Sequence, residues 1–249
     1  MADTNLNGLR VAILATDYFE QVELTEPKKA LDAAGAITKI IAPQPKQGQV
    51  TGFNHDTKGD TFKVDMPLEQ ANPADFDALL LPGGALNADN LRVVEKAQDF
   101  ARAIDRAQKP IAFICHAPWL LVSAGLTKGR KMTSYHTIKD DIRNSGGQWE
   151  NTEVVRDKNW VSSRQPDDIP AFNREMLSLF SQSKPGASTA QSSTRSSGDQ
   201  IAPEGAYTTE SLLGNQSSRD MRNATGQQET MKGQDDVLIH GDHPGLQNQ

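Results

Sequence analysis

The chain has 249 residues, a formal net charge of −6 at pH 7 and a single cysteine. The acidic balance gives no reason to expect nucleic acid or an anionic membrane as a partner. One cysteine excludes an intramolecular disulfide and a cysteine-based zinc site, and it fits a reducing compartment. The N-terminus lacks a basic region followed by an apolar core, and no apolar run reaches the roughly 20 residues of a membrane span. We therefore expect a cytoplasmic protein.

The first part of the chain predicts a β-α-β unit. Residues 9–15 and 38–42 are apolar and β-branched, which is typical of buried strands. Residues 20–34 between them predict a helix that ends at Gly35, with Pro27 in its first turn. This order of elements indicates a parallel sheet.

A hairpin-like excursion then interrupts the alternation, with two short strands at residues 50–53 and 61–65. A capped turn at residues 72–75 precedes the next core strand. Further strands are expected at residues 76–81, 111–114, 131–134, 153–156 and 160–163, and helices at residues 93–107, 119–124, 136–145 and 170–180.

The composition changes at Lys184. From there to Gln249 the chain is rich in serine, glutamine, asparagine and glycine and has almost no apolar periodicity. Such a segment cannot bury enough surface to offset its ordering entropy. We predict a folded α/β domain over residues 8–183 and a disordered polar tail over residues 184–249. Two short apolar clusters, 211–213 and 237–240, are either docking peptides or parts of a solvated tail.

Cys115 is the residue around which the chain is organised. It follows the apolar run 111–114 and precedes a segment with helical spacing, so it lies at a strand–turn–helix junction. Nucleophiles occupy such elbows in α/β enzymes. A helix N-terminus there would lower the thiol pKa, and its N–H groups could hold an oxyanion. The alternative is a small, inert, buried cysteine.

Three polar side chains are candidate partners of the thiol. His116 is either a general base, an orienting group or a helix cap, because neighbouring side chains in a turn usually point apart. Glu20 and Glu23 follow the first strand, so a parallel sheet would bring them to the same edge. They are either helix N-terminal carboxylates or include a protonated glutamate that hydrogen-bonds the thiol.

A second loop approaches the same edge after residue 81. Gly83 and Gly84 permit close backbone approach to a ligand, although two glycines after a strand also form an ordinary turn. Asp89 follows in the same loop.

Several motifs together resemble the PfpI family, the intracellular proteases, amidases and general stress proteins of the class I glutamine-amidotransferase-like superfamily. The resemblance covers residues 8–181. The motifs are Phe19-Glu20-Gln21-Val22-Glu23-Leu24-Thr25-Glu26-Pro27, Leu80-Leu81-Pro82-Gly83-Gly84, Ile114-Cys115-His116-Ala117-Pro118, Thr133-Ser134-Tyr135 and Ser162-Ser163-Arg164-Gln165-Pro166-Asp167-Asp168-Ile169-Pro170-Ala171-Phe172.

The resemblance implies a flavodoxin-like three-layer sandwich with a mainly parallel sheet and a nucleophile elbow at Cys115. The family's glutamate that touches the thiol carries over to Glu23, with Glu20 nearby. An acidic residue that reaches the histidine of a neighbouring subunit corresponds to Asp89, in a loop one residue longer than usual. Ala117 stands where the family usually has glycine, and its methyl group could narrow the oxyanion site.

The backbone groups of Gly83, Gly84 and Ala117 are the expected surroundings of that oxyanion site. The resemblance also implies an enzyme without cofactor or metal, which forms homodimers or larger assemblies. Family members have been assigned peptidase, glyoxalase and deglycase activities. Its substrates would accordingly be small carbonyl compounds, glycated groups or peptides.

The residues favour dicarbonyl chemistry, because a carboxyl beside a thiol can move a proton between adjacent carbons. Peptide hydrolysis needs an acid for the leaving amine, which His116 with Asp89 could supply across a subunit interface. Two readings of another class stay open. One is a redox-responsive stress or chaperone protein with an oxidisable Cys115 and no significant turnover. The other is a scaffold whose tail recruits partners.

Overall fold

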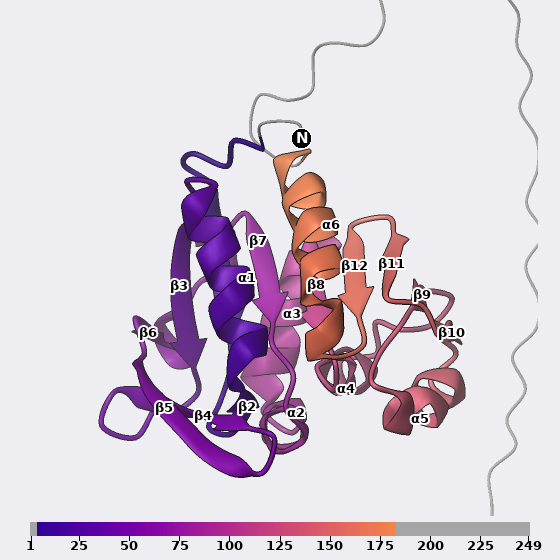
Figure 1. Ribbon diagram of the computed structural model, residues 1–249, viewed down its shortest axis with the longest axis horizontal. Helices are drawn as coiled ribbons and strands as arrows, with labels where there is room; N and C mark the ends of the chain where they lie inside the picture. The colour runs from indigo at the N-terminus through magenta and orange to yellow at the C-terminus, as the bar shows by residue number, and fades with distance from the viewer. Residues whose placement is uncertain (1–3, 183–249) are drawn as a thin grey trace, which may run out of the picture. The chain divides into compact units, whose positions relative to one another are not determined.

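The computed structural model describes residues 4–182, which are built on one central sheet. Its seven strands follow the order β11-β12-β8-β7-β1-β3-β6 (Figure 1). All neighbouring strands are parallel except β11 and β12, which confirms the predicted mainly parallel sheet. The strands are β1 (Arg10–Leu14), β3 (Ile37–Ala42), β6 (Met66–Pro67), β7 (Ala78–Leu81), β8 (Ile111–Ile114), β11 (Val154–Asp157) and β12 (Trp160–Ser163).

Helices cover both faces of this sheet, which explains why its central strands are apolar runs. Every residue of β7 and β8 is buried. On one face lie α1 (Gln21–Ala33) and α6 (Ile169–Ser181), and on the other α3 (Glu95–Arg106) and α4 (Pro118–Ser123) (Figure 1). Each face has its own apolar core cluster. The predicted three-layer sandwich is therefore confirmed.

The remaining elements are short. They are the helices α2 (Ala85–Arg92) and α5 (Lys139–Asn144), the strands β2 (Phe19–Glu20), β4 (Gln49–Asn54), β5 (Thr57–Lys63), β9 (Lys131–Met132) and β10 (Gln148–Trp149), and the single turns of 3-10 helix η1 (Leu68–Gln70), η2 (Pro73–Asp75), η3 (His136–Ile138) and η4 (Pro166–Asp168).

Helix α1 confirms one prediction and corrects another. Gly35 has a φ of 90° and follows the last turn, as predicted. Its N–H donates to Asp32 and the next N–H donates to Leu31, which closes the helix C-terminus. Pro27 does not lie in the first turn, because α1 already begins at Gln21. It is buried in the helix interior, where its missing N–H leaves the Glu23 carbonyl without an intrahelical donor.

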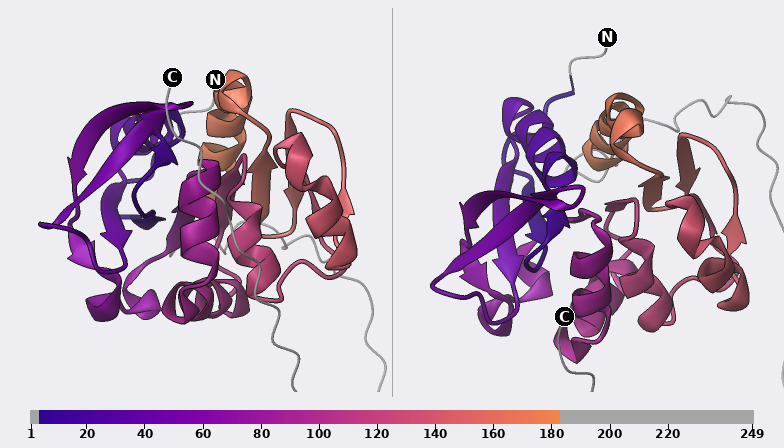
Figure 2. Two further views of the ribbon diagram at one scale, coloured as in Figure 1. Left: turned by 90° about the horizontal axis from the view of Figure 1, so that it is seen from below. Right: turned by 60° about the horizontal axis from the view of Figure 1, so that its bottom comes forward.

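The predicted hairpin is confirmed as the antiparallel pair β4 and β5. Strand β2 adds to it in parallel, which makes a separate three-stranded sheet. Figure 1 shows this small sheet beyond the carboxyl end of β3, with β2 beside α2, and Figure 2 gives two further views of it. The hairpin therefore stands at the sheet edge where the parallel strands end.

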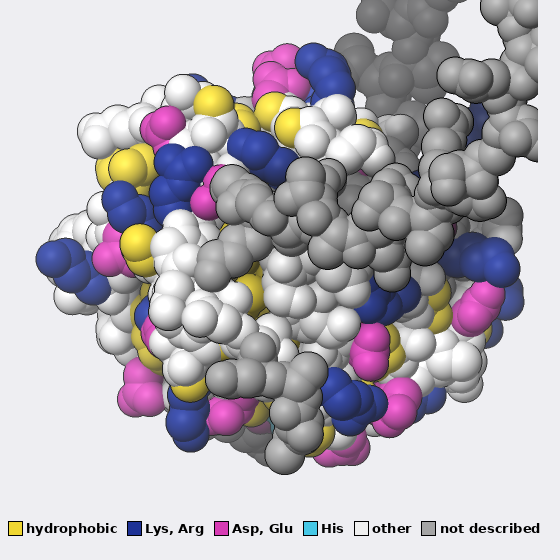
Figure 3. All heavy atoms as spheres, turned by 90° about the horizontal axis from the view of Figure 1, so that it is seen from above, with side chains coloured by type: hydrophobic (Ala, Val, Ile, Leu, Met, Phe, Trp, Pro, Cys, Tyr) yellow, Lys and Arg dark blue, Asp and Glu magenta, His cyan; other side chains and the backbone are white. Residues whose placement is uncertain are grey.

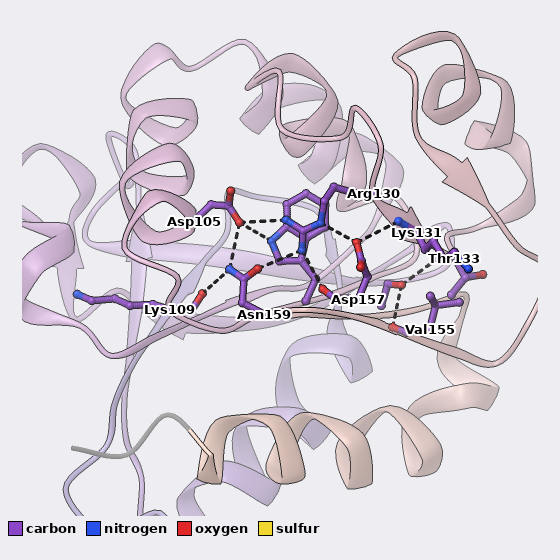
Figure 4. Close-up of polar contacts among 10 residues, drawn as sticks. Asp105, Lys109, Arg130, Lys131, Thr133, Val155, Asp157 and Asn159 are labelled. Atoms are coloured by element: carbon purple, nitrogen blue, oxygen red, sulfur yellow. Dashed lines mark hydrogen bonds and ion pairs between the residues drawn. The ribbon is translucent and has the colours of Figure 1, made fainter. Parts of the chain in front are cut away.

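A cluster of polar contacts around the buried Arg130 lies at the opposite ends of the strands, where β8 and β12 begin (Figure 4). Arg130 donates from Nε to Asp157 Oδ2 at 2.7 Å, and its guanidinium lies over the Trp160 ring at 3.6 Å from the centroid. Asp105 Oδ1 accepts from Trp160 Nε1 at 2.7 Å and from Asn159 Nδ2 at 3.1 Å. The cluster joins the end of α3 to the turn between β11 and β12.

Replacing Arg130 by methionine should destabilise the fold by about 3 kcal/mol, because Asp105 and Asp157 would lose a buried cationic partner. Urea unfolding of wild type and variant measures this difference. The matched control is Arg174→Met, whose side chain is 66% exposed and which should change stability by no more than about 0.5 kcal/mol. Equal losses in the two variants would contradict a structural role for the cluster.

The predicted tail over residues 184–249, with its two apolar clusters, lies outside the described residues and stays a prediction. Within residues 4–182, no helix is long and apolar enough to cross a membrane. On the face shown in Figure 3, lysine and arginine side chains are interspersed with aspartate and glutamate.

Candidate active site

Cys115 lies at a strained turn directly after β8. Its φ of 63° is in the left-handed region, which side chains other than glycine rarely adopt. Hydrogen bonds hold both sides of this residue: its N–H donates to Ser163 at 3.1 Å, and its carbonyl accepts from the Tyr135 N–H at 2.9 Å. The predicted elbow is thus present and is fixed from two other segments.

Glu23 places a buried carboxyl group beside this thiol. It comes from the first turn of α1, its side chain is fully buried, and hydrogen bonding with Cys115 is among the influences on its pKa. Oε2 also accepts the Gly83 N–H at 2.9 Å. Burial raises the pKa of Glu23 to about 8, and the neighbouring charge of Glu20 adds to this effect. Glu23 is therefore protonated at neutral pH.

The thiol does not have the lowered pKa expected at a helix N-terminus. Burial raises the pKa of Cys115 well above its ordinary value, and negative charge on Glu23 raises it further. The N–H groups of Gly84 and His116 hydrogen-bond the sulfur and act in the opposite direction. The expectation was wrong because α4 begins only at Pro118, whereas a buried carboxyl shares the site. Protonation of Glu23 removes the opposing charge.

His116 does reach the sulfur, although the two residues are adjacent. Its Nδ1 lies 3.1 Å from Cys115 Sγ, and its Nε2 lies 3.2 Å from Thr137 Oγ1. Burial, together with the charge of His136, lowers the pKa of His116 to about 4. The imidazole is therefore neutral at pH 7, and among residues 4–182 no carboxylate hydrogen-bonds it.

A side chain larger than hydrogen would clash with neighbouring atoms at Gly83 and at Gly84, and the backbone conformation of Gly84 also favours glycine. A Cβ on Gly83 would meet Glu23 Oε2, Cys115 Cβ and the Ile114 carbonyl oxygen, so only glycine lets this backbone lie against the pair. Gly84 has a φ of 87°, and a Cβ there would meet the backbone of β2. The two glycines therefore let the backbone lie against Glu23, Cys115 and β2, and their close approach to a ligand stays a prediction.

Of the three expected backbone positions, only Gly84 has an N–H group that acts on the sulfur, together with the N–H of His116. The Ala117 N–H donates to the Ile114 carbonyl at 3.1 Å, and the Gly83 N–H is used by Glu23. The Ala117 methyl group is buried in the apolar cluster beneath α4, so it does not narrow the site.

A cleft of about 520 Å³ opens above the thiol. Glu20 lines it, and Glu20 Oε2 accepts the His55 N–H at 3.1 Å. The structure therefore brings Cys115, His116, Glu23, Glu20 and Gly84 together. The lining residues are Tyr18, Glu20, Glu23, Phe53, His55, Asp56, Gly84, Ala85, Leu86, Cys115, His116, Tyr135 and Pro166.

Asp89 lies apart from the thiol and from the cleft in this chain. It is exposed on α2, a helix that the sequence does not predict, and it does not line the cleft. Its contact with the histidine of a neighbouring subunit stays a prediction. Within the described residues, no group of three potential ligands is arranged to hold a metal ion.

Asn87 is a site residue that the sequence analysis misses. Its side chain is fully buried and donates to the carbonyl oxygens of Pro82 at 3.1 Å and Gly83 at 2.9 Å, while Oδ1 accepts the Thr16 N–H at 2.7 Å. It thus fastens the glycine turn to the end of β1. An asparagine in a polar segment after two glycines carries no signal of this role.

Asn87→Ala should lower activity roughly tenfold or more, because the backbone that holds Glu23 and the thiol would shift. The Gly83 and Gly84 N–H groups lower the pKa values of Glu23 and Cys115, so a looser turn should move the activity–pH midpoint upward. Asn90→Ala, on the exposed side of the same helix, is the matched control. A variant that loses stability but keeps the wild-type midpoint would show that Asn87 has only a structural role.

Comparison with known proteins finds relatives over most of the described residues. The model of the DJ-1/PfpI family matches residues 9–179. A deglycase from Pyrococcus abyssi is 44% identical over 172 residues, which cover 69% of this chain and 99% of that protein. Over 69% of this chain and 97% of its own length, protein/nucleic acid deglycase 2 of Escherichia coli is 40% identical. General stress protein 18 of Bacillus subtilis is 41% identical, covering 70% of this chain and 98% of its own.

Among solved structures, Schizosaccharomyces pombe DJ-1 superposes with a TM-score of 0.61 at 19% identity. The match covers 68% of this chain and 90% of that protein. At this identity the likeness concerns the fold alone.

Proposed function

Since the chain belongs to the DJ-1/PfpI family, we propose that it is a cysteine-dependent enzyme acting on reactive dicarbonyls or on the adducts that they form. Relatives named as deglycases support an enzyme of this kind. The observation that carries the proposal is the buried pair of Cys115 and Glu23. The pair combines a nucleophile with a carboxyl whose pKa of about 8 suits proton transfer near neutral pH.

The first step joins the sulfur to the substrate. The Cys115 sulfur attacks the aldehyde carbon of an α-oxoaldehyde, a C–S bond forms, and the thiol proton passes to the former carbonyl oxygen to give a hemithioacetal. The N–H groups of Gly84 and His116 are placed to stabilise the developing negative charge on that oxygen. With an adduct on a protein amine, the sulfur displaces the nitrogen, so the C–N bond breaks and the amine leaves with a proton.

The second step moves a proton between neighbouring carbons. Glu23, as carboxylate, takes the proton from the carbon bonded to sulfur and returns it to the adjacent carbonyl carbon, while the hydroxyl proton of the hemithioacetal passes to the neighbouring ketone oxygen, which gives a thioester of an α-hydroxy acid. Water then adds to the thioester, the C–S bond breaks, and the acid and free thiol are released. The oxidation of one carbon balances the reduction of the next, so no external oxidant is consumed.

Peptide hydrolysis is the less well supported activity. It needs an acid to protonate the leaving amine, and His116, with a pKa lowered to about 4, is a poor proton donor at pH 7. Asp89 from a second copy in a homo-oligomer is the group that could change this. A dimer in which that contact forms would therefore favour peptidase activity.

The buried thiol beside a protonated carboxyl also favours a second candidate, a redox-responsive protein. A Cys115 sulfinate could accept a hydrogen bond from Glu23. Intact-mass measurement after mild peroxide, combined with activity assays, separates the two. Oxidation confined to Cys115 in a protein without turnover supports the sensor.

The test of the proposed function is a comparison of substrate classes. Purified full-length protein is incubated with methylglyoxal, with methylglyoxal adducts of a thiol and of an amine, and with casein, and products are identified by NMR and gel electrophoresis. We expect lactate from methylglyoxal or its adducts. Cleavage of casein without lactate formation would contradict the proposal.

A further inference from the structure

Acidic and aromatic side chains form the mouth of the cleft, whereas the thiol lies at its floor. The mouth is formed by β2 and by the turn between β4 and β5, and it presents the carboxylates of Glu20 and Asp56 beside the aromatic rings of Tyr18 and Phe53. Among residues 4–182, no lysine or arginine lines the cleft, and His55 is the only basic group at its mouth. The His55 Nδ1 lies 3.5 Å from Glu20 Oε2.

The acidic and aromatic groups are held in place. The Glu20 side chain is only 12% exposed, and its carboxylate accepts the His55 N–H. Tyr18 and Phe53 pack edge to face with their centroids 4.8 Å apart, and Tyr18 remains 38% exposed. Carboxylates and aromatic faces are the groups that attract ammonium and guanidinium ions.

A separate observation at the floor points to a ligand. Glu23 Oε1 is buried and has no hydrogen-bond partner within the described part of the chain, although Glu23 lines the cleft. A buried carboxyl oxygen without a partner is costly unless a bound group completes it. The substrate that reaches Glu23 must pass or occupy the acidic mouth.

We propose that the mouth selects substrates that carry a positive charge next to the adducted carbon, with Asp56 as the specificity-determining residue. This inference rests on the function proposed above and names its substrate class. Dicarbonyl adducts on lysine or arginine side chains keep a basic nitrogen, whereas adducts on cysteine are neutral. The protein therefore prefers adducts on basic side chains.

Asp56 is suited to this role by its position. It is exposed at the tip of the hairpin, where its Oδ1 accepts only the hydroxyl of the neighbouring Thr57 at 3.2 Å within residues 4–182. One carboxylate oxygen is thus left to meet a cation, while Glu20 is already engaged by His55.

The test compares three substrates that undergo the same reaction but differ in net charge. Methylglyoxal hemithioacetals of dimethylaminoethanethiol, N-acetylcysteamine and mercaptopropionate are cationic, neutral and anionic, and lactate formation gives kcat/KM for each. We expect the cationic probe to exceed the anionic one by about 10-fold at low salt, and the ratio to fall as salt is added. Asp56→Asn should lower that ratio by about 3-fold. Glu95→Gln, an exposed acid on α3 outside the cleft, should leave it unchanged.

Equal values for the three probes in the wild type, or an unchanged ratio in Asp56→Asn, would overturn the proposed selectivity while the proposed reaction stands. Failure of the wild type to turn over any probe or free methylglyoxal would instead overturn the proposed function, and the selectivity with it.

Discussion

Replacing Cys115 by serine should lower lactate formation from methylglyoxal by about 10³-fold or more. Serine is nearly the same size, so the elbow and its two backbone hydrogen bonds can persist. Its hydroxyl is far less acidic than a thiol, and the Glu23 carboxylate, which is the minor form of that side chain at neutral pH, is too weak a base to activate it. The covalent step therefore fails although the cleft is intact.

Because Cys115 is the only cysteine, chemical modification gives a matched control. Wild type alkylated with iodoacetamide should fall to the same rate as the serine variant, and thermal unfolding should show that the variant is folded. A folded serine variant that retains the wild-type rate would show that the thiol is not the nucleophile.

Glu23→Gln is expected to reduce turnover by about 10²–10³-fold. Glutamine can still accept the Gly83 N–H, so the local packing is preserved while proton transfer is lost. In the wild type, activity should rise with pH up to about 8, because the carboxyl must ionise before it can take a proton from carbon. This rising limb should be absent from the glutamine variant.

Glu20→Gln is the matched control on the same segment. Glu20 lines the cleft but is not hydrogen-bonded to the thiol, so its replacement should cost less than about tenfold for a neutral substrate. Equal losses of turnover in the two glutamine variants would mean that Glu23 contributes only negative charge to the site and does not transfer a proton. A pH profile that is unchanged in Glu23→Gln would contradict its role as the proton carrier.

The core of the fold could be predicted from the sequence because both faces of the central strands are buried. Strands such as β7 and β8 are uninterrupted apolar runs, and α3 has one apolar face, so local pattern and tertiary burial agree. The short elements could not be predicted in this way. Strand β2 has two residues, too few for any period, and α2 follows two glycines with a polar sequence.

In the candidate site, too, some features could be predicted from the sequence and others could not. The places of Cys115 and Glu23 after parallel strands predict that both reach the same edge of the sheet, and the family resemblance implies their contact. The directions of the backbone N–H groups depend on the turn itself, which is why Gly84 and His116, rather than Ala117, face the sulfur. The raised pKa of the thiol depends on its burial and on the nearby Glu23 carboxyl, and neither can be predicted from the local sequence around Cys115.

The central claim is that Glu23, more than His116, controls the reactivity of Cys115, and the pH dependence of thiol alkylation by iodoacetamide tests it most directly. Glu23→Gln removes the negative charge that raises the thiol pKa, so the alkylation midpoint should move to lower pH. His116→Gln should leave the midpoint unchanged, because a histidine with a pKa of about 4 is neutral throughout the range. A midpoint that moves in His116→Gln and stays in Glu23→Gln would contradict the claim.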